Sequence, residues 1–444
     1  MLLGTQQVNE NGRLEIGGCD TIGLAREFGT PLYVMDEELI RQDCREYVQA
    51  FKQLYTEAES EIAFAGKAFL TTAMCAIADS EGLSLDVVSP GELHTARAAG
   101  FPMSRVLFHG NSKSAEDLAA ALDLKVGRIV VDNLQELELL DAITRHRTQS
   151  VDILIRLTPG IDPHTHKYVQ TGKADTKFGL NIRDGSAMKG IERALAVPMI
   201  NLKGIHCHVG SQLLDTEAHE QATAIMADFM REALDETGFV VEQLNLGGGL
   251  GSRYIESHNR PTVEDLADRI VAVTRAKLSQ HGLRPPRLIV EPGRSIVGEA
   301  GTTLYTIGTI KEVSITEDPG KRTYVAVDGG LSDNPRPALY EAVYTAVVAN
   351  RADQPADWTV TICGRHCESD TLIRDAKIAS AEPGDVLAML STGAYNYSMA
   401  SNYNRFQKPA VVLVAGGKAD LIVRRETLDE LVANDVMPER LRKT

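Results

Sequence analysis

Eight short apolar segments, each ending in polar or glycine residues, constrain the fold of this chain more than any other feature. They are EIAFAGK (61–67), LSLDVVS (83–89), RVLFHG (105–110), RIVVDN (128–133), VDILIRLT (151–158), NLKGIHCHVGS (201–211), QLNLGGG (243–249) and RLIVEPGR (287–294). Segments this short and this rich in Val, Ile and Leu are typical of strands buried on both faces.

Helix-like stretches lie between these segments, at residues 91–100, 114–124, 134–147, 217–238 and 263–282. Ser114 begins an S-A-E-D sequence that suits a helix N-terminus, and Gly238 and Gly282 suit helix C-termini. Parallel strands need such crossovers, and closing the sheet removes its edges. The pattern therefore predicts an α/β fold, a (β/α)₈ barrel of TIM type, with an open doubly wound sheet as the alternative.

After Arg294 the alternation of strand-like and helix-like segments ends. Strand-like segments joined by Gly and Pro turns follow, namely TTLYTIGTI, RTYVAVD, WTVTICG, DVLAMLS and AVVLVA. They predict a mostly-β second domain, and 444 residues are too many for one ordinary core. We expect an N-terminal segment (1–36) joining the β domain or capping the barrel, a barrel (37–300) and a mostly-β domain (301–444).

Composition narrows the class of partner. The formal charge of −15 argues against nucleic acid or an anionic membrane as the main partner. There is no run of 18 apolar residues, and the first residues lack the basic start and apolar run of a signal peptide. Six scattered cysteines are too few for a disulfide scaffold. We therefore expect a cytoplasmic protein.

The polar residues that end the eight segments are expected to share one rim, because active sites of such barrels form at the C-terminal ends of the strands. These residues are Lys67, Asp86, Ser89, His109, Asp132, His208, Ser211, Gly247, Gly248, Gly249, Glu291 and Arg294. Loops after the seventh and eighth strands commonly bind phosphate, and here they are GGGLG and EPGR. Glycine amides and the Arg294 charge suit a phosphate, although a glycine triplet can also be a simple tight turn.

Lys67 and Glu291 extend this interpretation to a cofactor. Lys67 follows a nearly apolar strand, and desolvation would favour the neutral amine that Schiff-base chemistry requires. A lysine opposite a phosphate loop suggests pyridoxal phosphate, and a carboxylate at Glu291 would keep the pyridine nitrogen protonated. The plainer alternatives are a lysine that extends to solvent and an exposed glutamate before a proline turn.

Two groups of residues raise the question of a metal site. His206 and His208 lie two residues apart with no acidic neighbour in the sequence, so stacking of His208 on a ring is favoured over metal binding. Cys363, His366 and Cys367 lack a nearby fourth ligand. No metal is predicted. His164 and His166 lie in a long loop (163–175) and are interpreted as solvated.

Ten motifs in order resemble those of the diaminopimelate decarboxylases, a branch of the alanine-racemase-like (fold type III) pyridoxal-phosphate enzymes. They are AGKAF, LDVVSPGEL, FHGNSKS, TGKADTKFGL, GIHCHVGSQ, LNLGGGLG, EPGRSIVGEAG, VDGGLSDNPRPALY, CGRHCES and GAYNYSMASNYN. The resemblance spans Lys67 to Tyr403, and NPRPALY and CES favour the diaminopimelate branch. Phe64 and Phe69 depart from the wider superfamily, and Asp370 directly follows Ser369, where many members carry one more residue.

The resemblance implies three groups of site residues. Those that bind pyridoxal 5'-phosphate are Lys67, His208, Ser211, Gly248, Gly249, Glu291, Gly293, Arg294 and Tyr395. Those that bind substrate are Arg294, Arg336, Tyr340, Glu368 and Tyr395. Those that take part in catalysis are Lys67, His208 and Cys367.

Within these groups, Lys67 carries the cofactor and Cys367 donates a proton. In such enzymes the segment with the cysteine enters the site from the other subunit, which implies a homodimer with its active site at the subunit interface. The implied reaction is decarboxylation of meso-2,6-diaminopimelate to L-lysine and carbon dioxide, in lysine biosynthesis. The alternatives are a decarboxylase of arginine, ornithine or carboxynorspermidine, and a non-catalytic pyridoxal-phosphate-binding protein; a racemase would carry an arginine in place of Glu291.

Overall fold

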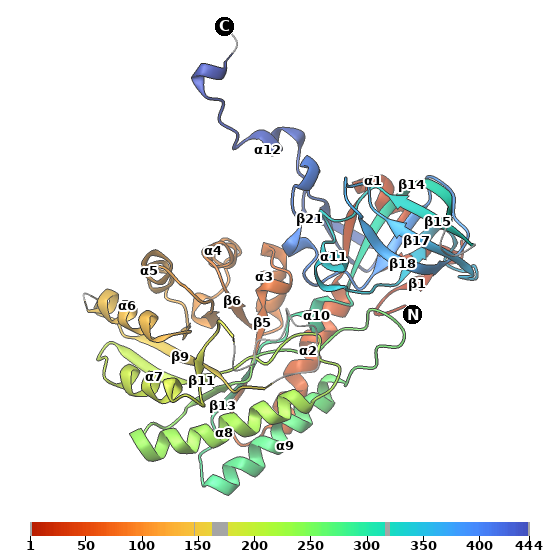
Figure 1. Ribbon diagram of the computed structural model, residues 1–444. Helices are drawn as coiled ribbons and strands as arrows, with labels where there is room; N and C mark the ends of the chain where they lie inside the picture. The colour runs from red at the N-terminus through yellow and green to blue at the C-terminus, as the bar shows by residue number, and fades with distance from the viewer. Residues whose placement is uncertain (1, 146, 162–175, 316–319, 443–444) are drawn as a thin grey trace. The chain divides into compact units, whose positions relative to one another are not determined.

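The computed structural model describes residues 2–145, 147–161, 176–315 and 320–442. The chain divides into two compact units (Figure 1), of which one is Ile40–Gly298 and the other combines Met1–Leu39 with Glu299–Thr444. We call them the barrel unit and the β unit and describe each by itself.

Eight parallel strands form the wall of the barrel unit. They are β5 (Ser60–Ala65), β6 (Ser84–Val87), β7 (Val106–Phe108), β8 (Arg128–Val131), β9 (Val151–Thr158), β11 (Ile200–His206), β12 (Gln243–Asn245) and β13 (Arg287–Val290). Strand β13 pairs with β5, and β8 pairs with β9, so the sheet closes on itself. The two-residue β10 (Leu180–Asn181) pairs with β9 outside this ring. The predicted (β/α)₈ barrel is confirmed, and the open doubly wound sheet is wrong.

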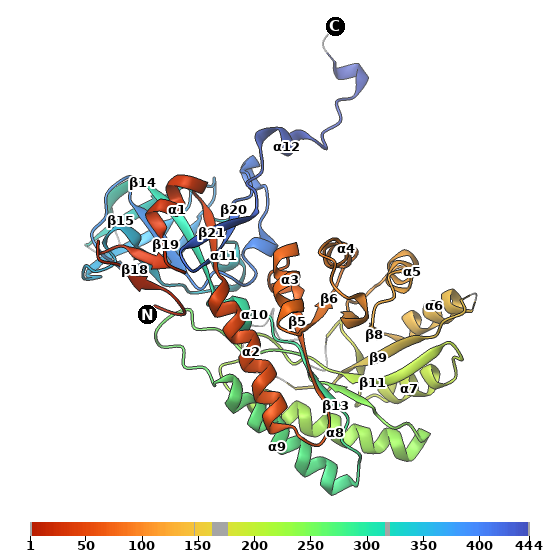
Figure 2. The same cartoon turned by 180° about the vertical axis from the view of Figure 1, so that it is seen from behind.

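Helices surround the strands, as Figures 1 and 2 show from opposite sides. They are α2 (Glu37–Leu54), α3 (Thr72–Ser80), α4 (Pro90–Ala98), α5 (Ala115–Asp123), α6 (Leu134–Thr144), α7 (Ser186–Leu195), α8 (Glu217–Thr237), α9 (Val263–His281) and the short α10 (Arg294–Val297). The sequence did not predict α2, α3, α7 and α10. Ser114 caps α5 in a capping box, and Gly238 and Gly282 end α8 and α9 at φ values of 74° and 63°, as predicted.

Several predicted segments are longer than the strands they contain. Strand β12 ends at Asn245, and Gly247 has a φ of 67°, which a strand cannot accommodate. Strand β5 ends at Ala65, and Lys67 lies in a single 3₁₀ turn (Gly66–Ala68). The polar residues at these two ends therefore lie in turns just beyond the sheet. Their side chains do not have to alternate between the two faces of the sheet, as side chains within a strand do.

The barrel core explains why these strands close. Ala63, Leu107, Val130, Leu154 and Ile289 come from five strands and pack as one fully buried cluster. Strands β6, β7 and β8 are buried at every position, which is the burial expected of strands covered on both faces.

The β unit is built on the long strand β14 (Gly301–Ile315). Its sheet has the order β18 (Thr371–Ile378), β17 (Trp358–Cys363), β15 (Gly320–Val327), β14, β4 (Leu32–Asp36), β20 (Ala410–Ala415) and β21 (Lys418–Val423), and β19 (Val386–Leu390) joins β14 to β16 (Ala346–Val348). Because β4 pairs with β14 and β20, the N-terminal segment joins this unit. The small elements are β1 (Gln7–Val8), β2 (Leu14–Ile16), β3 (Cys19–Asp20), α1 (Thr21–Phe28), α11 (Arg336–Tyr340) and α12 (Leu428–Val432).

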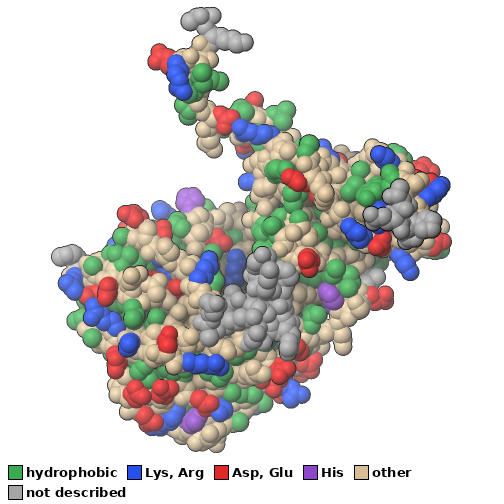
Figure 3. Space-filling view, viewed as in Figure 1, with side chains coloured by type: hydrophobic (Ala, Val, Ile, Leu, Met, Phe, Trp, Pro, Cys, Tyr) green, Lys and Arg blue, Asp and Glu red, His purple; other side chains and the backbone are tan. Residues whose placement is uncertain are grey.

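Two further observations concern the surface. On the face of the barrel unit drawn in Figure 3, acidic and basic side chains are intermixed. Among the described residues no helix is both long enough and apolar enough to cross a membrane. The predicted loop 163–175, with His164 and His166, lies outside the described residues.

Candidate active site

A cavity of about 350 Å³ lies at the C-terminal ends of the barrel strands. Its lining residues are Lys67, Val88, His109, Gly110, Asn111, Arg156, Phe178, His206, His208 and Glu291. Four of the residues predicted on one rim, Lys67, His109, His208 and Glu291, therefore line one cavity. Of the other predicted rim residues, Ser89 instead caps α4, and Asp132 accepts a hydrogen bond from the Gly179 amide at 3.0 Å.

Lys67 is less desolvated than its sequence neighbours suggested. Its side chain is 38% exposed, and its Nζ lies 3.2 Å from Oδ2 of Asp86, whose own side chain is 1% exposed. The expectation of an apolar setting is wrong because the turn after β5 directs the lysine out of the apolar strand and towards a buried carboxylate. An anion at this distance favours the ammonium form over the neutral amine.

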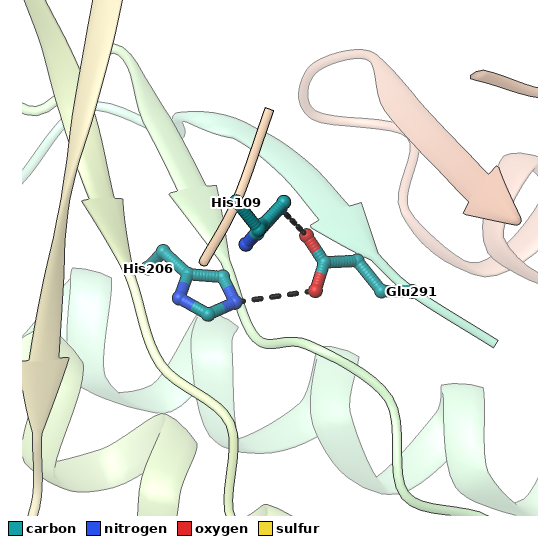
Figure 4. Close-up of side chains that lie close together, drawn as sticks. All are labelled: His109, His206 and Glu291. Atoms are coloured by element: carbon teal, nitrogen blue, oxygen red, sulfur yellow. Dashed lines mark hydrogen bonds and ion pairs between the residues drawn. The ribbon is translucent and has the colours of Figure 1, made fainter. Parts of the chain in front are cut away.

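Glu291 is a buried carboxylate surrounded by nitrogen atoms. Its Oε1 accepts a hydrogen bond from Nδ2 of Asn245 at 2.6 Å and lies 2.9 Å from Nε2 of His109. Its Oε2 lies 3.2 Å from Nε2 of His206. Figure 4 shows the two imidazoles approaching different oxygens of the carboxylate. The sequence interpretation that His206 has no acidic neighbour is therefore wrong, because Glu291 reaches it from β13, two strands away.

Burial sets the protonation of these groups. It lowers the pKa of His206 to about 4, although Glu291 opposes that shift. Burial also lowers the pKa of His208 well below its ordinary value, with the Lys67 charge acting in the same direction. For Glu291, burial raises the pKa, but the two imidazoles more than reverse this effect, and the pKa lies below its ordinary value. At neutral pH the site therefore holds a carboxylate beside a neutral His206.

Ligand spacing in this cluster also suits a metal ion. Among the described residues, His109, His206 and Glu291 are the one group of three or more His, Cys, Asp or Glu side chains whose ligand atoms lie close together, within 4.8 Å. Each of the two nitrogens already lies at hydrogen-bonding or ion-pair distance from the carboxylate. The contacts thus have an explanation without a metal. The predicted alternative with Cys363, His366 and Cys367 does not form such a group in the described part of the chain.

The glycine turn after β12 is held close to β13 and β11. A Cβ added to Gly248 would lie 2.1 Å from the carbonyl oxygen of Glu291, so no other residue fits at that position. The Gly248 amide donates to Nδ1 of His208 at 3.2 Å, and Gly249 has a φ of 141°. On the other side, a Cβ on Gly293 would lie 2.9 Å from Cβ of Ala65. The predicted phosphate loop after β12 thus brings bare backbone against Glu291 and His208, two residues that line the cavity.

Arg294 lies beside the glycine turn. Its Nε and Nη2 donate to Oγ of Ser211 at 3.2 and 3.0 Å, and its Nη1 donates to the hydroxyl of Tyr254. Its carbonyl oxygen accepts from Oγ of Ser252 at 3.0 Å. The structure therefore brings Arg294 and Ser211 together, as the sequence predicted, and adds Tyr254 and Ser252.

In the β unit, three of the predicted substrate residues lie together. The guanidinium carbon of Arg336 lies 5.1 Å from the ring centre of Tyr340 and 5.5 Å from that of Tyr395. Arg336 is 6% exposed, and Pro335 and Pro337 flank it at the start of α11. Tyr395 has a φ of 63°, a conformation that costs an aromatic residue about 1–3 kcal/mol. Arg336 therefore lies within cation–π distance of two aromatic rings.

Cys367 and Glu368 lie on a turn of the β unit that Asp370 closes. Oδ2 of Asp370 accepts from the backbone amide of His366 at 3.2 Å and lies 2.5 Å from Nδ1 of the same residue. His366 is buried, whereas Cys367 and Glu368 are exposed. Tyr403 donates to Oε1 of Glu368 at 2.6 Å. Asp370, whose role the sequence left open, fastens the turn that presents Cys367.

Some residues around the cavity were missed or left without a role. Asp86 and His109 were placed on the rim, but no function followed from their position. Arg156 lines the cavity with its guanidinium carbon 4.4 Å from the ring centre of Phe178, and Asn245 holds Glu291. A charged or amide side chain inside a segment buried on both faces is the signal that would have identified both.

Comparison with known proteins defines the class of this fold and site. Residues 38–298 match the family model described as pyridoxal-dependent decarboxylase, pyridoxal binding domain. That stretch covers more than half of the chain and contains the whole barrel, with Lys67 and Glu291 at its cavity. The chain is thus an enzyme of the pyridoxal-dependent decarboxylase class, and its cofactor is pyridoxal 5'-phosphate.

Individual relatives narrow the class. The diaminopimelate decarboxylase of Bacillus subtilis (strain 168) is 48% identical over 436 residues, which are 98% of each chain. That of Staphylococcus aureus (strain COL) is 44% identical over 97% of this chain and 99% of its own. The crystal structure of the diaminopimelate decarboxylase from M. jannaschii in co-complex with L-lysine superimposes with a TM-score of 0.92, at 38% identity and 100% coverage of both chains. The chain belongs to the diaminopimelate decarboxylase family.

The barrel residues fit the cofactor on three structural grounds. The bare backbone at Gly248 leaves a cradle that a Cβ would fill. Oδ1 of Asp86 is buried without a hydrogen-bond partner among the described residues, with Nε2 of His109 3.7 Å away, and Oδ2 of the same carboxylate faces the Lys67 amine. Arg294 and Ser211 add polar groups of the kind that binds phosphate. Lys67, Glu291 and this turn would hold the cofactor at its aldehyde, ring and phosphate ends.

Proposed function

We propose that this enzyme removes carbon dioxide from meso-2,6-diaminopimelate and releases L-lysine. The observation that carries the proposal is the 48% identity with a diaminopimelate decarboxylase over 98% of both chains. The solved structure of the M. jannaschii relative was obtained with L-lysine, the expected product, and matches this chain over its whole length. The cavity chemistry supports the same reaction class, since an amine and a buried carboxylate line it and a phosphate-type turn contacts its lining residues His208 and Glu291.

Each residue in the barrel has a proposed task. Pyridoxal phosphate, when bound, supplies an aldehyde that captures amines and a ring that accepts the electrons left by the departing carboxylate. Lys67 would hold the aldehyde end, and Oδ2 of Asp86, 3.2 Å from its Nζ, stabilises the ammonium form of that amine. Glu291 would pair with the pyridine nitrogen and favour its protonated form, and His208 would pack on the ring.

The phosphate group is the proposed ligand of the glycine turn. The residues assigned to it are Ser211, Gly248, Gly249, Gly293 and Arg294, with Tyr395 nearby. Two of them carry support from geometry, because Arg294 and Ser211 already hydrogen-bond to each other at 3.0 Å. A phosphate bound here would replace the contact between Arg294 and Ser211 by several charge-assisted hydrogen bonds to the phosphate oxygens.

Specificity for diaminopimelate is assigned to the distal end of the substrate. Arg336, supported by Tyr340 and Tyr395, would hold the distal carboxylate, together with Arg294, and Glu368 would hold the distal ammonium. Lysine, ornithine and arginine lack that carboxylate. A site built to pair a polar group rejects analogues without it by roughly 10⁴-fold, because the buried partner stays unpaired.

Cys367 is the proposed donor of the proton that replaces the carboxyl group. The thiol is exposed in the β unit, on the turn fastened by Asp370. We infer a homodimer in which Cys367 and Glu368 of one copy complete the site of the other. All six cysteines are free, which supports the inference of a reducing, cytoplasmic location.

A single-turnover assay tests the proposed function. The purified enzyme with pyridoxal phosphate is mixed with meso-diaminopimelate, and carbon dioxide and lysine are measured alongside the cofactor's visible absorbance. We expect one equivalent of lysine for each site. Arginine, ornithine and carboxynorspermidine are the comparison substrates. Faster carbon dioxide release from any of them would replace the substrate assignment, and no release from any of the four would leave a non-catalytic cofactor-binding protein.

A further inference from the structure

Asn245 connects two parts of the barrel site that the proposed mechanism treats separately. It lies fully buried at the end of β12. Its Oδ1 accepts a hydrogen bond from the Gly247 amide at 2.9 Å, and its Nδ2 donates to Oε1 of Glu291 at 2.6 Å. Because the oxygen must face an N–H group, the amide can have only one orientation, and its NH₂ group must face the carboxylate.

His206 holds the second oxygen of the same carboxylate. Its Nε2 lies 3.2 Å from Oε2 of Glu291, and its Nδ1 is buried without a hydrogen-bond partner among the described residues. A neutral imidazole carries one N–H, and the contact with the carboxylate places it on Nε2. Burial lowers the pKa of this residue to about 4, so it donates a hydrogen bond without adding a positive charge.

The geometry points to Asn245 and His206 as positioning residues that hold the Glu291 carboxylate in one orientation towards the cofactor ring. Asn245 also ties that carboxylate to the glycine turn proposed to bind phosphate. This inference rests on the proposed function, in which Glu291 serves the ring and the turn serves the phosphate. A movement of the Glu291 carboxylate or of the glycine turn is therefore transmitted to the other through the side-chain amide of Asn245.

Asn245→Asp is the sharpest test, because it preserves size and the acceptor for Gly247 while replacing the donor by an oxygen. Above neutral pH two carboxylates would face each other, and Glu291 would move away. At lower pH one proton can lie between them and restore a donor. Among the described residues, the other ionisable side chains around the carboxylate are His109, His206, Cys207, Asp86, Lys67, Arg156 and His208.

Two measurements follow the variant from pH 6 to pH 8.5. The first is the dissociation constant for pyridoxal phosphate, obtained by equilibrium dialysis of the cofactor-free protein. The second is kcat with meso-diaminopimelate. At pH 8.5 we expect the dissociation constant to rise and kcat to fall, each roughly 10- to 100-fold relative to the unmodified protein, which is the effect typical of losing a donor to a buried charge. At pH 6 we expect each of these losses to be smaller by at least about 10-fold.

Asn201→Asp is the matched control. Asn201 is the second residue of β11, at the end of the strand remote from His206, and its exposed side-chain amide donates to Asp152 and Ser150. The same substitution there should leave both pH profiles unchanged. If Asn245→Asp gives profiles parallel to those of the control, the positioning role is overturned.

His206 supplies a second test that does not depend on Asn245→Asp folding. His206→Leu removes the donor and fills similar space, whereas His206→Gln retains an N–H. We expect the cofactor's affinity to fall roughly 10-fold in the leucine variant and to return to within about threefold in the glutamine variant. Equal losses in the two variants would indicate a packing role and overturn the inference for His206. A failure of the proposed function is distinguishable, because the unmodified protein would then release no lysine while the cofactor affinities would still test the inference.

Discussion

Nζ of Lys67, a residue that lines the same cavity as Glu291, lies 3.2 Å from Oδ2 of the buried Asp86. The pair joins the turn after β5 to the end of β6, the neighbouring strand. Because an adjacent anion favours the ammonium form, Asp86 governs when the amine becomes a nucleophile.

Asp86→Asn should speed the uptake of pyridoxal phosphate by the cofactor-free protein. Only the neutral amine attacks an aldehyde, so at pH 7 we expect uptake roughly 10-fold faster than in the unmodified protein. Stopped-flow measurement of the growing visible absorbance checks this. Asp132→Asn is the control, since that carboxylate instead accepts from the Gly179 amide. Slower uptake in Asp86→Asn, or the same rate in both variants, would contradict the role of Asp86.

Arg336→Ala should remove the preference for diaminopimelate. Turnover of that substrate should fall roughly 10⁴-fold, because its distal carboxylate would lose its cationic partner. The guanidinium contacts two tyrosine rings, so a lysine at this position should restore only part of the activity. Steady-state kinetics of the alanine and lysine variants measure this, with the exposed Arg374→Ala on β18 as the control. Near-normal turnover in Arg336→Ala would remove the substrate assignment.

Asp370→Ala should reduce turnover without disturbing the cofactor. The Asp370 carboxylate fastens His366, next to Cys367, and its loss frees the turn. We expect kcat to fall roughly 10- to 100-fold, as for a lost buried charged hydrogen bond, while the visible absorbance stays as in the unmodified protein. Asp375→Asn, exposed on β18, the strand that begins just after Asp370, is the control. Loss of the absorbance together with activity would show that Asp370 acts more widely than on this turn.

Gly248→Ala should abolish cofactor binding. The added Cβ would lie 2.1 Å from the carbonyl oxygen of Glu291, so the backbone of the turn must move away from the cavity. We expect the dissociation constant for pyridoxal phosphate to rise more than about 100-fold, measured by equilibrium dialysis. Gly91→Ala is the matched control, because a Cβ there meets its nearest atom, Oγ of Ser89, at 3.7 Å. Unchanged affinity in Gly248→Ala would exclude this turn from the site.

The barrel unit should lose stability as the pH falls from 6.5 to 4, in part because of His219. Burial lowers the pKa of His219 to about 4, with the Gly248 carbonyl opposing the shift. The unfolded chain then binds more protons than the folded chain in this window, so stability is present above pH 6.5 and declines below it. One such histidine contributes about 2 kcal/mol of the loss at pH 5.

His219→Gln should therefore flatten that decline. The amide can still donate to the Gly248 carbonyl, which lies 3.3 Å from the imidazole, but it does not titrate. Urea unfolding at pH 7.5 and pH 5, followed by circular dichroism, gives the two free energies of unfolding. The exposed His94→Gln is the control. An unchanged difference between the two pH values in His219→Gln would contradict the assignment.

Much of the barrel was predictable because its signals are local. A run such as VDILIRLT coincides with β9, and the caps at Ser114, Gly238 and Gly282 lie where the side chains and glycines indicated. The β unit was less predictable. Strand β18, with charged residues at exposed positions, gave no apolar run, and its pairing partner β17 is what makes it a strand.

The site, like the fold, could be predicted from the sequence only in part. The order of strands and turns along the chain determined that Lys67, His208, the glycine turn and Glu291 would gather at one end of a barrel, since parallel strands all direct their C-terminal ends the same way. Only the tertiary structure decided which polar atoms meet across strands distant in sequence. The 3.2 Å contact of Lys67 with Asp86 and the clamp of Asn245 and His206 on Glu291 depend on side-chain direction beyond the strand ends. Local sequence does not encode that direction, because hydrogen bonds and ion pairs act between atoms brought together only when the sheet closes.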